Sequence, residues 1–167
     1  MFDPTAYDNL KVILEGAVYD LDLHKVIQVI NRRDLVDLAS MSRHYQINFC
    51  LPFDKKIVVQ LDLRMELEQL AGELLRSNQT PGCIILITFF VKEKSIDSNT
   101  KIIETLRNMW VDAADVRHSV TVVSNSHLHD HHYQIDFQRK ITESNSFDIE
   151  NLVEHVVLTL QKLPIND

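Results

Sequence analysis

The sequence predicts an α+β domain with a mixed, largely antiparallel sheet built from β-hairpins and about three amphipathic helices packed mainly on one face. Two alternating segments, 44–51 and 56–63, flank a short turn and therefore predict a hairpin. The segment 84–91 is almost continuously apolar, and other segments place apolar residues at helical spacing. The chain has 167 residues, which fits a single globular domain over 1–167.

The first third of the chain is predicted to form hairpins. Residues 10–19 match the apolar period of both a strand and a helix, and we favour a strand that pairs with residues 25–31. A single helical turn is expected at 34–39. The strands at 44–51 and 56–63 then form the next hairpin.

Three helices are predicted, at 64–77, 99–114 and 147–162. Ser146 is the expected N-cap of the last one, and Pro164 ends it. Each has an apolar stripe, which is typical of a helix that packs on a sheet. The stripe of the first helix consists of Leu67, Leu70, Ala71, Leu74 and Leu75.

The segment 84–91 is expected to be a central strand covered on both faces, because its hydrophobicity does not alternate. Residues 119–124 and 132–141 are predicted as the final hairpin, with a run of histidines at its turn.

Charge and targeting signals limit the partners of the chain. The formal net charge is −7, which argues against a large nucleic-acid footprint and against adhesion to anionic membranes. The N-terminus has no basic region followed by an apolar core, and the longest apolar run is far shorter than the ~20 residues of a membrane helix. We therefore expect a cytoplasmic protein without membrane contact.

Cysteine and glycine usage excludes several common sites. Cys50 and Cys83 each lie in an apolar run and lack the short spacing of zinc or redox motifs, so buried thiols are expected. The only glycines are Gly16, Gly72 and Gly82, which are far apart. A phosphate-cradling loop needs several glycines in one short stretch, so common nucleotide-binding folds are disfavoured.

A six-residue near-repeat links two predicted strands. Residues 44–49 read His-Tyr-Gln-Ile-Asn-Phe, and residues 132–137 read His-Tyr-Gln-Ile-Asp-Phe. One interpretation is an internal duplication with units around 41–78 and 118–163. We favour coincidence between two amphipathic strands, since the similarity fades on both sides.

The histidine run is the one concentration of residues able to bind a metal or move protons. Neutral imidazole is a common metal ligand, and alternate residues of an extended segment point to the same side. The candidate ligands for a divalent ion such as Zn²⁺ or Mn²⁺ are His127, His129, Asp130, His131 and His132. His44 and Asp136 are possible additional members of this site. The interpretation we favour is an exposed polar turn.

Three enzyme families share fragments of pattern with the chain. The order His-x-His-Asp-His-His at 127–132 resembles the His-x-His-x-Asp-His of metallo-β-lactamase-type hydrolases, with the acid one position early. Asp130 with Asp136, Gln138 and Lys140 is similar to the acid and Lys arrangement of PD-(D/E)xK nucleases, although Gln138 stands where an acid is usual.

The third resemblance involves Asp20 and Asp22. They follow an apolar segment as in haloacid-dehalogenase-type phosphatases, in which the first Asp is the nucleophile. Leu23 and His24 replace the Gly and Thr of that motif. We carry no activity over from the three families, because each pattern is incomplete.

The resulting expectation is a non-enzymatic domain that acts by association, as a homodimer or with another cytoplasmic protein, and without a cofactor. Sheet edges left by hairpins must be covered, and pairing with another chain is one way. The alternative is a metal-dependent hydrolase or phosphodiesterase centred on 127–132. A small-molecule sensor is a third class, which requires an apolar pocket that sequence alone cannot reveal.

Overall fold

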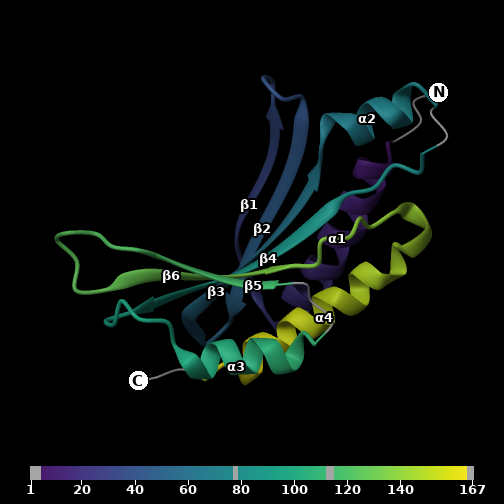
Figure 1. The fold of residues 1–167 in the computed structure, drawn as a ribbon. Coiled ribbons are helices and arrows are strands. Elements are labelled where there is room, and N and C mark those ends of the chain that lie inside the picture. The colour runs from purple at the N-terminus through teal and green to yellow at the C-terminus, as the bar shows by residue number, and fades with distance from the viewer. Residues whose placement is uncertain (1–4, 77–78, 112–114, 165–167) are drawn as a thin grey trace.

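A six-stranded antiparallel sheet forms the centre of the protein (Figure 1). The computed structural model describes residues 5–76, 79–111 and 115–164. Its strand order is β1-β2-β3-β4-β6-β5, so the predicted α+β class is confirmed, although the described sheet is antiparallel rather than mixed. The strands are β1 (Gln28–Asp37), β2 (Ser42–Leu51), β3 (Asp54–Met65), β4 (Ile84–Glu93), β5 (Asp115–Thr121) and β6 (His129–Asp136).

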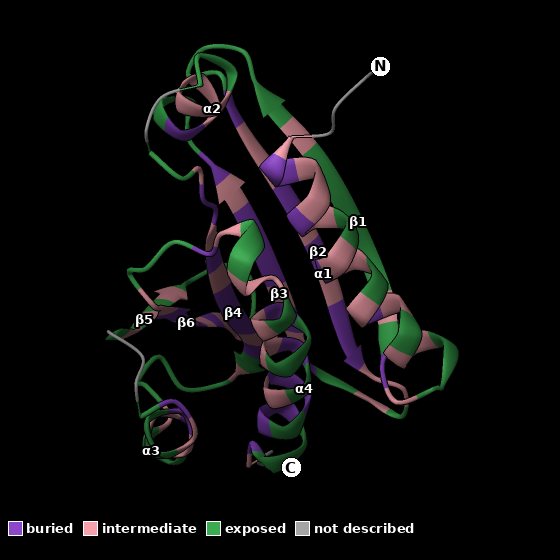
Figure 2. Cartoon of the chain, turned by 90° about the vertical axis from the view of Figure 1, so that its right-hand side faces the viewer, coloured by how far each residue is buried: buried purple, intermediate pink, exposed green. Residues whose placement is uncertain are grey.

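Four α-helices accompany the sheet in the described part of the chain, one more than expected. Three of them cover one face, where α1 and α4 lie side by side and α3 packs near β5 (Figure 2). The other helix, α2, lies at one end of the sheet beside the β1–β2 turn (Figure 1). The helices are α1 (Ala6–Leu23), α2 (Leu67–Leu74), α3 (Thr100–Met109) and α4 (Phe147–Lys162).

The predicted strand at 10–19 is wrong, because this segment lies within α1. Thr5 begins the helix, and its side chain accepts a hydrogen bond from the Asp8 amide at 3.2 Å. The buried positions Tyr7, Leu10, Leu14 and Val18 follow the helical period. This stripe extends beyond the short stretch that alternates, and it therefore decides the local structure.

The region after α1 also differs from expectation. The predicted helical turn at 34–39 is wrong, since β1 extends to Asp37 and pairs with β2 along its length. The Asp37 carboxylate accepts a hydrogen bond from the Ala39 amide at 2.9 Å, and Met41 has a φ of 56°. An acidic side chain that bonds the backbone two residues later is typical of a turn, and here it reverses the chain into β2.

The predicted hairpin of β2 and β3 is confirmed, as is the central position of β4. Odd-numbered residues of β2, β3, β4 and β6 face the helices and form the core, with Ile47, Leu61 and Ile87 fully buried. Even-numbered residues form the opposite face, which we call the open face. The described helices do not cover it, so Leu86 and Phe90 of β4 are only half-buried, contrary to the prediction.

The last two predicted helices are confirmed, α4 with its predicted bounds of 147–162 and α3 with shifted ends. Asn99 caps α3 by accepting hydrogen bonds from two backbone amides, and Ala113 lies outside the described residues. The expected N-cap of α4, Ser146, makes no capping bond through its side chain. Thr142 and Asn145 instead form a capping box around the short 3₁₀ turn Glu143–Asn145 just before α4.

Candidate functional site

The histidine run begins in the loop after β5 and continues into β6. His127 lies in this loop, whereas His129–Asp136 is a strand paired with β4 and β5. The expected placement of the whole run in a turn is therefore wrong, although the hairpin itself is confirmed. Strand alternation directs His131 to the core and His132 to the open face. Within residues 5–76, 79–111 and 115–164, no three His, Cys, Asp or Glu side chains gather to hold a metal.

His131 is fully buried and lies at the centre of a hydrogen-bonded chain. Its Nε2 is 2.8 Å from the Ser95 carbonyl oxygen, and its Nδ1 is 2.9 Å from Nε2 of His118. Because a carbonyl only accepts, Nε2 of His131 carries the proton and donates it. In the neutral pair, Nδ1 of His131 then accepts from Nε2–H of His118. We call His118 and His131 the histidine pair.

The surroundings favour the neutral form of His118. Burial lowers the pKa of His118, and the neighbouring His131 lowers it further, against the opposing effect of Glu93. The His118 ring lies 5.2 Å from the His131 ring and 4.8 Å from the Tyr133 ring, measured between centroids. The Tyr133 hydroxyl accepts a hydrogen bond from the Asn99 amide. The pair and Tyr133 thus anchor the loop between β4 and α3 to the sheet.

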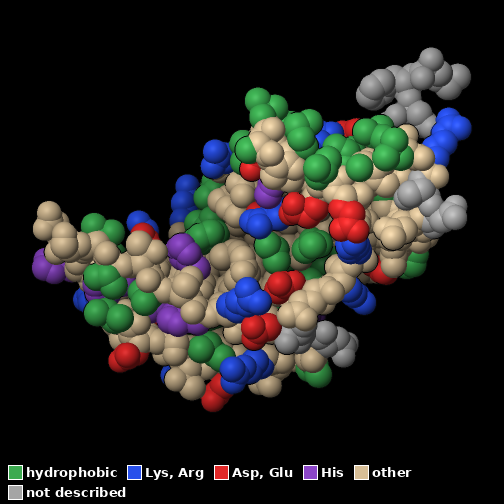
Figure 3. Space-filling model, turned by 45° about the horizontal axis from the view of Figure 1, so that its top comes forward, with side chains coloured by type: hydrophobic (Ala, Val, Ile, Leu, Met, Phe, Trp, Pro, Cys, Tyr) green, Lys and Arg blue, Asp and Glu red, His purple; other side chains and the backbone are tan. Residues whose placement is uncertain are grey.

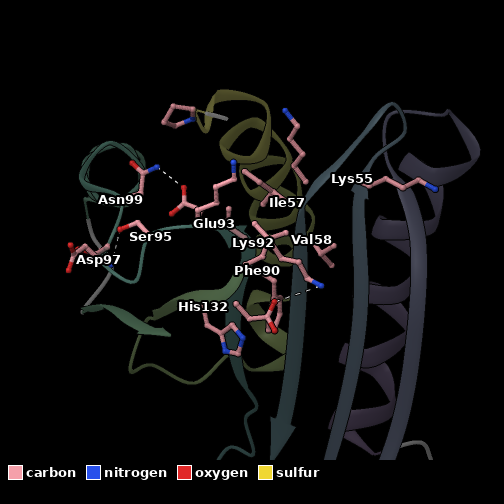
Figure 4. Close-up of a pocket in the computed structure, with 17 residues that line it drawn as sticks. Lys55, Ile57, Val58, Phe90, Lys92, Glu93, Ser95, Asp97, Asn99 and His132 are labelled. Carbon is pink, nitrogen blue, oxygen red and sulfur yellow. Dashed lines mark hydrogen bonds and ion pairs between the residues drawn. The ribbon is translucent and has the colours of Figure 1, made fainter. Parts of the chain in front are cut away.

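His132 points away from this pair and lines a pocket of about 890 Å³ (Figure 4). The pocket lies where β3 begins, β4 ends and β6 begins. Phe90 contacts His132 edge to face, with ring centroids 4.7 Å apart. Apolar walls come from Ile57, Val58, Phe90, Val91 and Leu128, while Lys55, Lys56, Lys92 and Lys94 also contribute to the lining. We call this hollow the lysine-rimmed pocket.

The two additional residues expected near the histidines lie apart from them. His44 is on β2, which is separated from β6 by β3 and β4, and its Nε2 lies 3.0 Å from the Ser42 hydroxyl. Asp136 is the last residue of β6. One of its carboxylate oxygens accepts a hydrogen bond from the Gln138 amide at 2.9 Å. The structure therefore brings neither residue to the histidine pair.

The near-repeat occupies equivalent faces of two separated strands. Tyr45 and Ile47 on β2, and Tyr133 and Ile135 on β6, point into the core and are buried. Since β3 and β4 lie between these strands, the repeat does not form a joint patch of His, Gln and acidic residues. The shared burial pattern accounts for the apolar half of the match, and duplication stays a hypothesis.

Two of the family resemblances lose their structural basis. Asp20 and Asp22 lie in α1, whereas the phosphatase pattern requires them at the end of a strand. β6 ends at Asp136, and Gln138 has a φ of 51°, so Gln138 and Lys140 do not continue a strand face. The nuclease-like arrangement of alternating side chains is consequently absent from this segment.

The side of α2 that faces the core is opposite to the predicted one. The helix is shorter than the expected 64–77, and its one buried residue is the polar Gln69. The Gln69 side chain is 7% exposed and accepts a hydrogen bond from the Gly82 amide at 3.2 Å. One Glu73 oxygen accepts from the Ala6 amide at 2.7 Å, where a carboxylate suits the positive N-terminal end of α1. These two bonds fix the rotation of α2.

As a result, part of the leucine stripe faces solvent. Leu70 packs partly against the core, but Leu67, Leu74 and Leu75 are 49%, 68% and 80% exposed. Figure 3 shows hydrophobic side chains gathering over the end of the molecule that carries α2 and the β1–β2 turn. We call this region the α2-end surface. Its exposed apolar residues are Val36, Leu38, Met41, Leu67, Leu74 and Leu75.

Sequence reasoning missed the inward residues of α2 and the histidine pair. Gln69 and Glu73 are four residues apart, which on a helix defines a polar stripe opposite the leucines. His118 alternates with Val116 and Val120, and this alternation places it on the inner face of β5. Both signals are present in the sequence, but neither identifies the partner group across the fold.

In comparisons with known proteins, no family model, no curated protein and no solved structure matches this chain. No helix in the described ranges combines the length and the hydrophobicity needed to cross a membrane. The geometry of the molecule is therefore the basis for a functional proposal.

Proposed function

We propose that the protein acts by association, as a homodimer formed through the α2-end surface, and that it has no catalytic role. The observation that carries this proposal is the rotation of α2, which turns Gln69 and Glu73 inward to bond the backbone while leaving Leu74 and Leu75 in solvent. Contiguous exposed apolar residues on a folded protein typically mark an interaction site.

A second copy is a suitable partner for this surface. The leucines of α2 form a ridge, and Leu38 and Met41 extend the apolar area to the adjacent β1–β2 turn. A twofold axis would place the ridge of each copy against the turn of the other, so that both apolar regions are buried together. The same residues then serve on both sides of the interface.

The free edge of β1 is a less suitable place for association. Arg32 and Asp34 on this strand form ion pairs with Glu15 and Lys11 of α1 at 2.7 and 2.8 Å. Charged residues along an edge strand oppose the addition of another strand. The α2-end surface lacks this protection.

The alternative proposal, a metal-dependent hydrolase, requires ligands that converge. His131 and His132 point to opposite faces of β6, and the bonds of His131 engage both of its nitrogens. The geometry therefore favours association. Elemental analysis of protein purified without a histidine tag separates the two proposals, because stoichiometric zinc or manganese would support the hydrolase.

Light scattering coupled to size exclusion tests the homodimer directly. The native protein should have the mass of a dimer at micromolar concentration. A Leu74→Glu and Leu75→Glu double variant should be monomeric, because each copy would press two unpaired carboxylates against the apolar β1–β2 turn of the other. Val12→Glu is the matched control, since Val12 is 64% exposed on α1 and lies outside the α2-end surface. A monomeric native protein, or a dimer that survives the double substitution, would contradict the proposal.

A further inference from the structure

We propose that the lysine-rimmed pocket binds a small amphipathic carboxylate, with the apolar part of the ligand against Phe90 and the carboxylate at Lys92 and Lys94. This inference is independent of the proposed homodimer, whose α2-end surface lies at the opposite end of β3 and β4. The pocket is therefore a second candidate site, with its own chemistry.

The size and walls of the pocket suit a small organic molecule. Its volume of about 890 Å³ lies within the range of roughly 300–1,000 Å³ that is common for small-ligand sites. Val58 and Phe90 are half-buried on the open face, while Leu128, in the loop before β6, lines the same hollow and is 42% exposed. An alkyl or aryl group in contact with these side chains would leave water.

The charge of the lining specifies the polar part of the ligand. Four lysines and three acids line the pocket, in a protein whose net charge is −7. One acid, Glu93, accepts a hydrogen bond from the Asn99 side chain at 2.8 Å and points toward it (Figure 4). Another, Asp130, lies 3.9 Å from the Lys92 ammonium, at the outer limit of an ion pair.

Lys92 is consequently able to accept an anionic ligand. Its side chain is 71% exposed, and in Figure 4 it extends between Val58 and Phe90. Lys94 makes no ion pair with any residue of the described ranges. A carboxylate that replaced the long contact to Asp130 would gain shorter, charge-assisted hydrogen bonds.

A smaller hollow of about 380 Å³ shares Phe90 and His132 with the lysine-rimmed pocket. Its remaining lining is polar and includes Arg117 and Gln134. Arg117 is already paired with Asp115 at 3.3 Å. We therefore place the carboxylate at the lysines and use Arg117 as the comparison site.

Calorimetric titration with decanoate tests this inference, with decanol and acetate as matched probes. Decanoate should bind the native protein, whereas decanol lacks the charge and acetate lacks the chain, so each should bind at least about tenfold more weakly. A Lys92→Glu and Lys94→Glu double variant should lose about tenfold or more in affinity for decanoate. Arg117→Glu, which changes the charge just outside the pocket, should bind as the native protein does.

A second pair of variants tests the apolar wall without disturbing the core. Leu128→Glu should abolish decanoate binding, because it places a carboxylate in the pocket. Val123→Glu should not, since Val123 is 49% exposed on the same loop but does not line the pocket. No decanoate binding by the folded native protein, equal binding of decanol, or preference for an acidic peptide over decanoate would overturn the inference. A decanoate affinity that is unchanged in both the lysine double variant and the Leu128→Glu variant would also overturn it.

Discussion

Apolar side chains have different surroundings at the two ends of the central strands β3 and β4. Where β3 ends, α2 is anchored by Gln69 and Glu73, and its leucines face solvent. Where β3 begins, Phe90 and its neighbours line a hollow, and lysines surround them. An apolar stripe alone therefore does not determine which side of a helix faces the core. The polar groups that must be satisfied inside the fold decide which way it faces.

The largest effect is expected from the buried half of the histidine pair, at the pocket end. His131→Ala removes a fully buried ring and leaves the Ser95 carbonyl and His118 without their partner. We expect a loss of about 2–4 kcal/mol in the free energy of unfolding, measured by urea denaturation.

His132→Ala is the control for this substitution, because the neighbouring side chain faces the open side of β6 and is only half-buried. It should cost less than about 1 kcal/mol. Equal losses for the two variants would show that the alternation of β6 does not distinguish these histidines in the folded protein.

The next largest effect on stability is expected at Gly82, where two segments of the chain approach closely beside α2. Cys83 and Ile141 exchange two backbone hydrogen bonds of 2.8 and 2.7 Å. A Cβ atom at Gly82 would lie 2.9 Å from Cβ of Lys140 and 3.2 Å from the Ile141 oxygen. Gly82→Ala should therefore destabilise the protein by about 1–3 kcal/mol in urea denaturation.

Gly16→Ala provides a comparison of opposite sign. Gly16 is exposed on α1, and an added Cβ meets nothing within 4 Å. Alanine should stabilise this helix by about 0.5–1 kcal/mol relative to glycine. If Gly82→Ala also stabilised the protein, the strand contact beside α2 would have to be looser than the structure describes.

Sequence patterns predict where helices and strands lie better than they predict which side of each element faces the core. The hairpin of β2 and β3, the central β4 and the helix α4 follow from long, consistent periods. The strand predicted at 10–19 is wrong because residues 10–18 satisfy two periods, and the choice between them depends on Thr5 and Tyr7, outside the ambiguous stretch. The periodicity of α2 was correct, but the inward side of the helix depends on Gly82 and Ala6, which are distant in sequence.

The candidate site shows the same limit. The alternation of β6 separates His131 from His132, and this much follows from strand geometry once the strand is recognised. The partners of His131, however, come from β5 and from the loop after β4. Strand order brings them together, and strand order is not encoded in any local pattern of this chain.

A smaller effect is expected from the anchor of α2. Gln69→Ala leaves the Gly82 amide without the acceptor that it has in the fold, and this should cost about 1–2 kcal/mol. Glu68→Ala is the matched control, since Glu68 is exposed on the adjacent position of α2. Urea denaturation of both variants should separate them. If Gln69→Ala is as stable as Glu68→Ala, the bond to Gly82 does not fix the rotation of the helix.

The smallest effect is a pH dependence located at the pocket end. Burial, together with the neighbouring His131, keeps the pKa of His118 below its ordinary value near about 6.5. The unfolded chain therefore takes up a proton at His118 more readily than the folded protein does. The resulting stabilisation is complete above the unfolded pKa and is lost progressively as the pH falls through the window beneath it.

Melting temperatures of the native protein and of His118→Asn, recorded between roughly pH 7.5 and 5.5, isolate this contribution. Asparagine keeps a donor for Nδ1 of His131 but does not titrate. The melting temperature of the native protein should fall more on acidification than that of the variant.

The named residues of the α2-end surface include no histidine, so the dimer should persist in the same pH window. Identical slopes for the two proteins would show that the fold does not favour neutral His118. Dimer dissociation over this window would instead show that the two ends of the sheet are coupled.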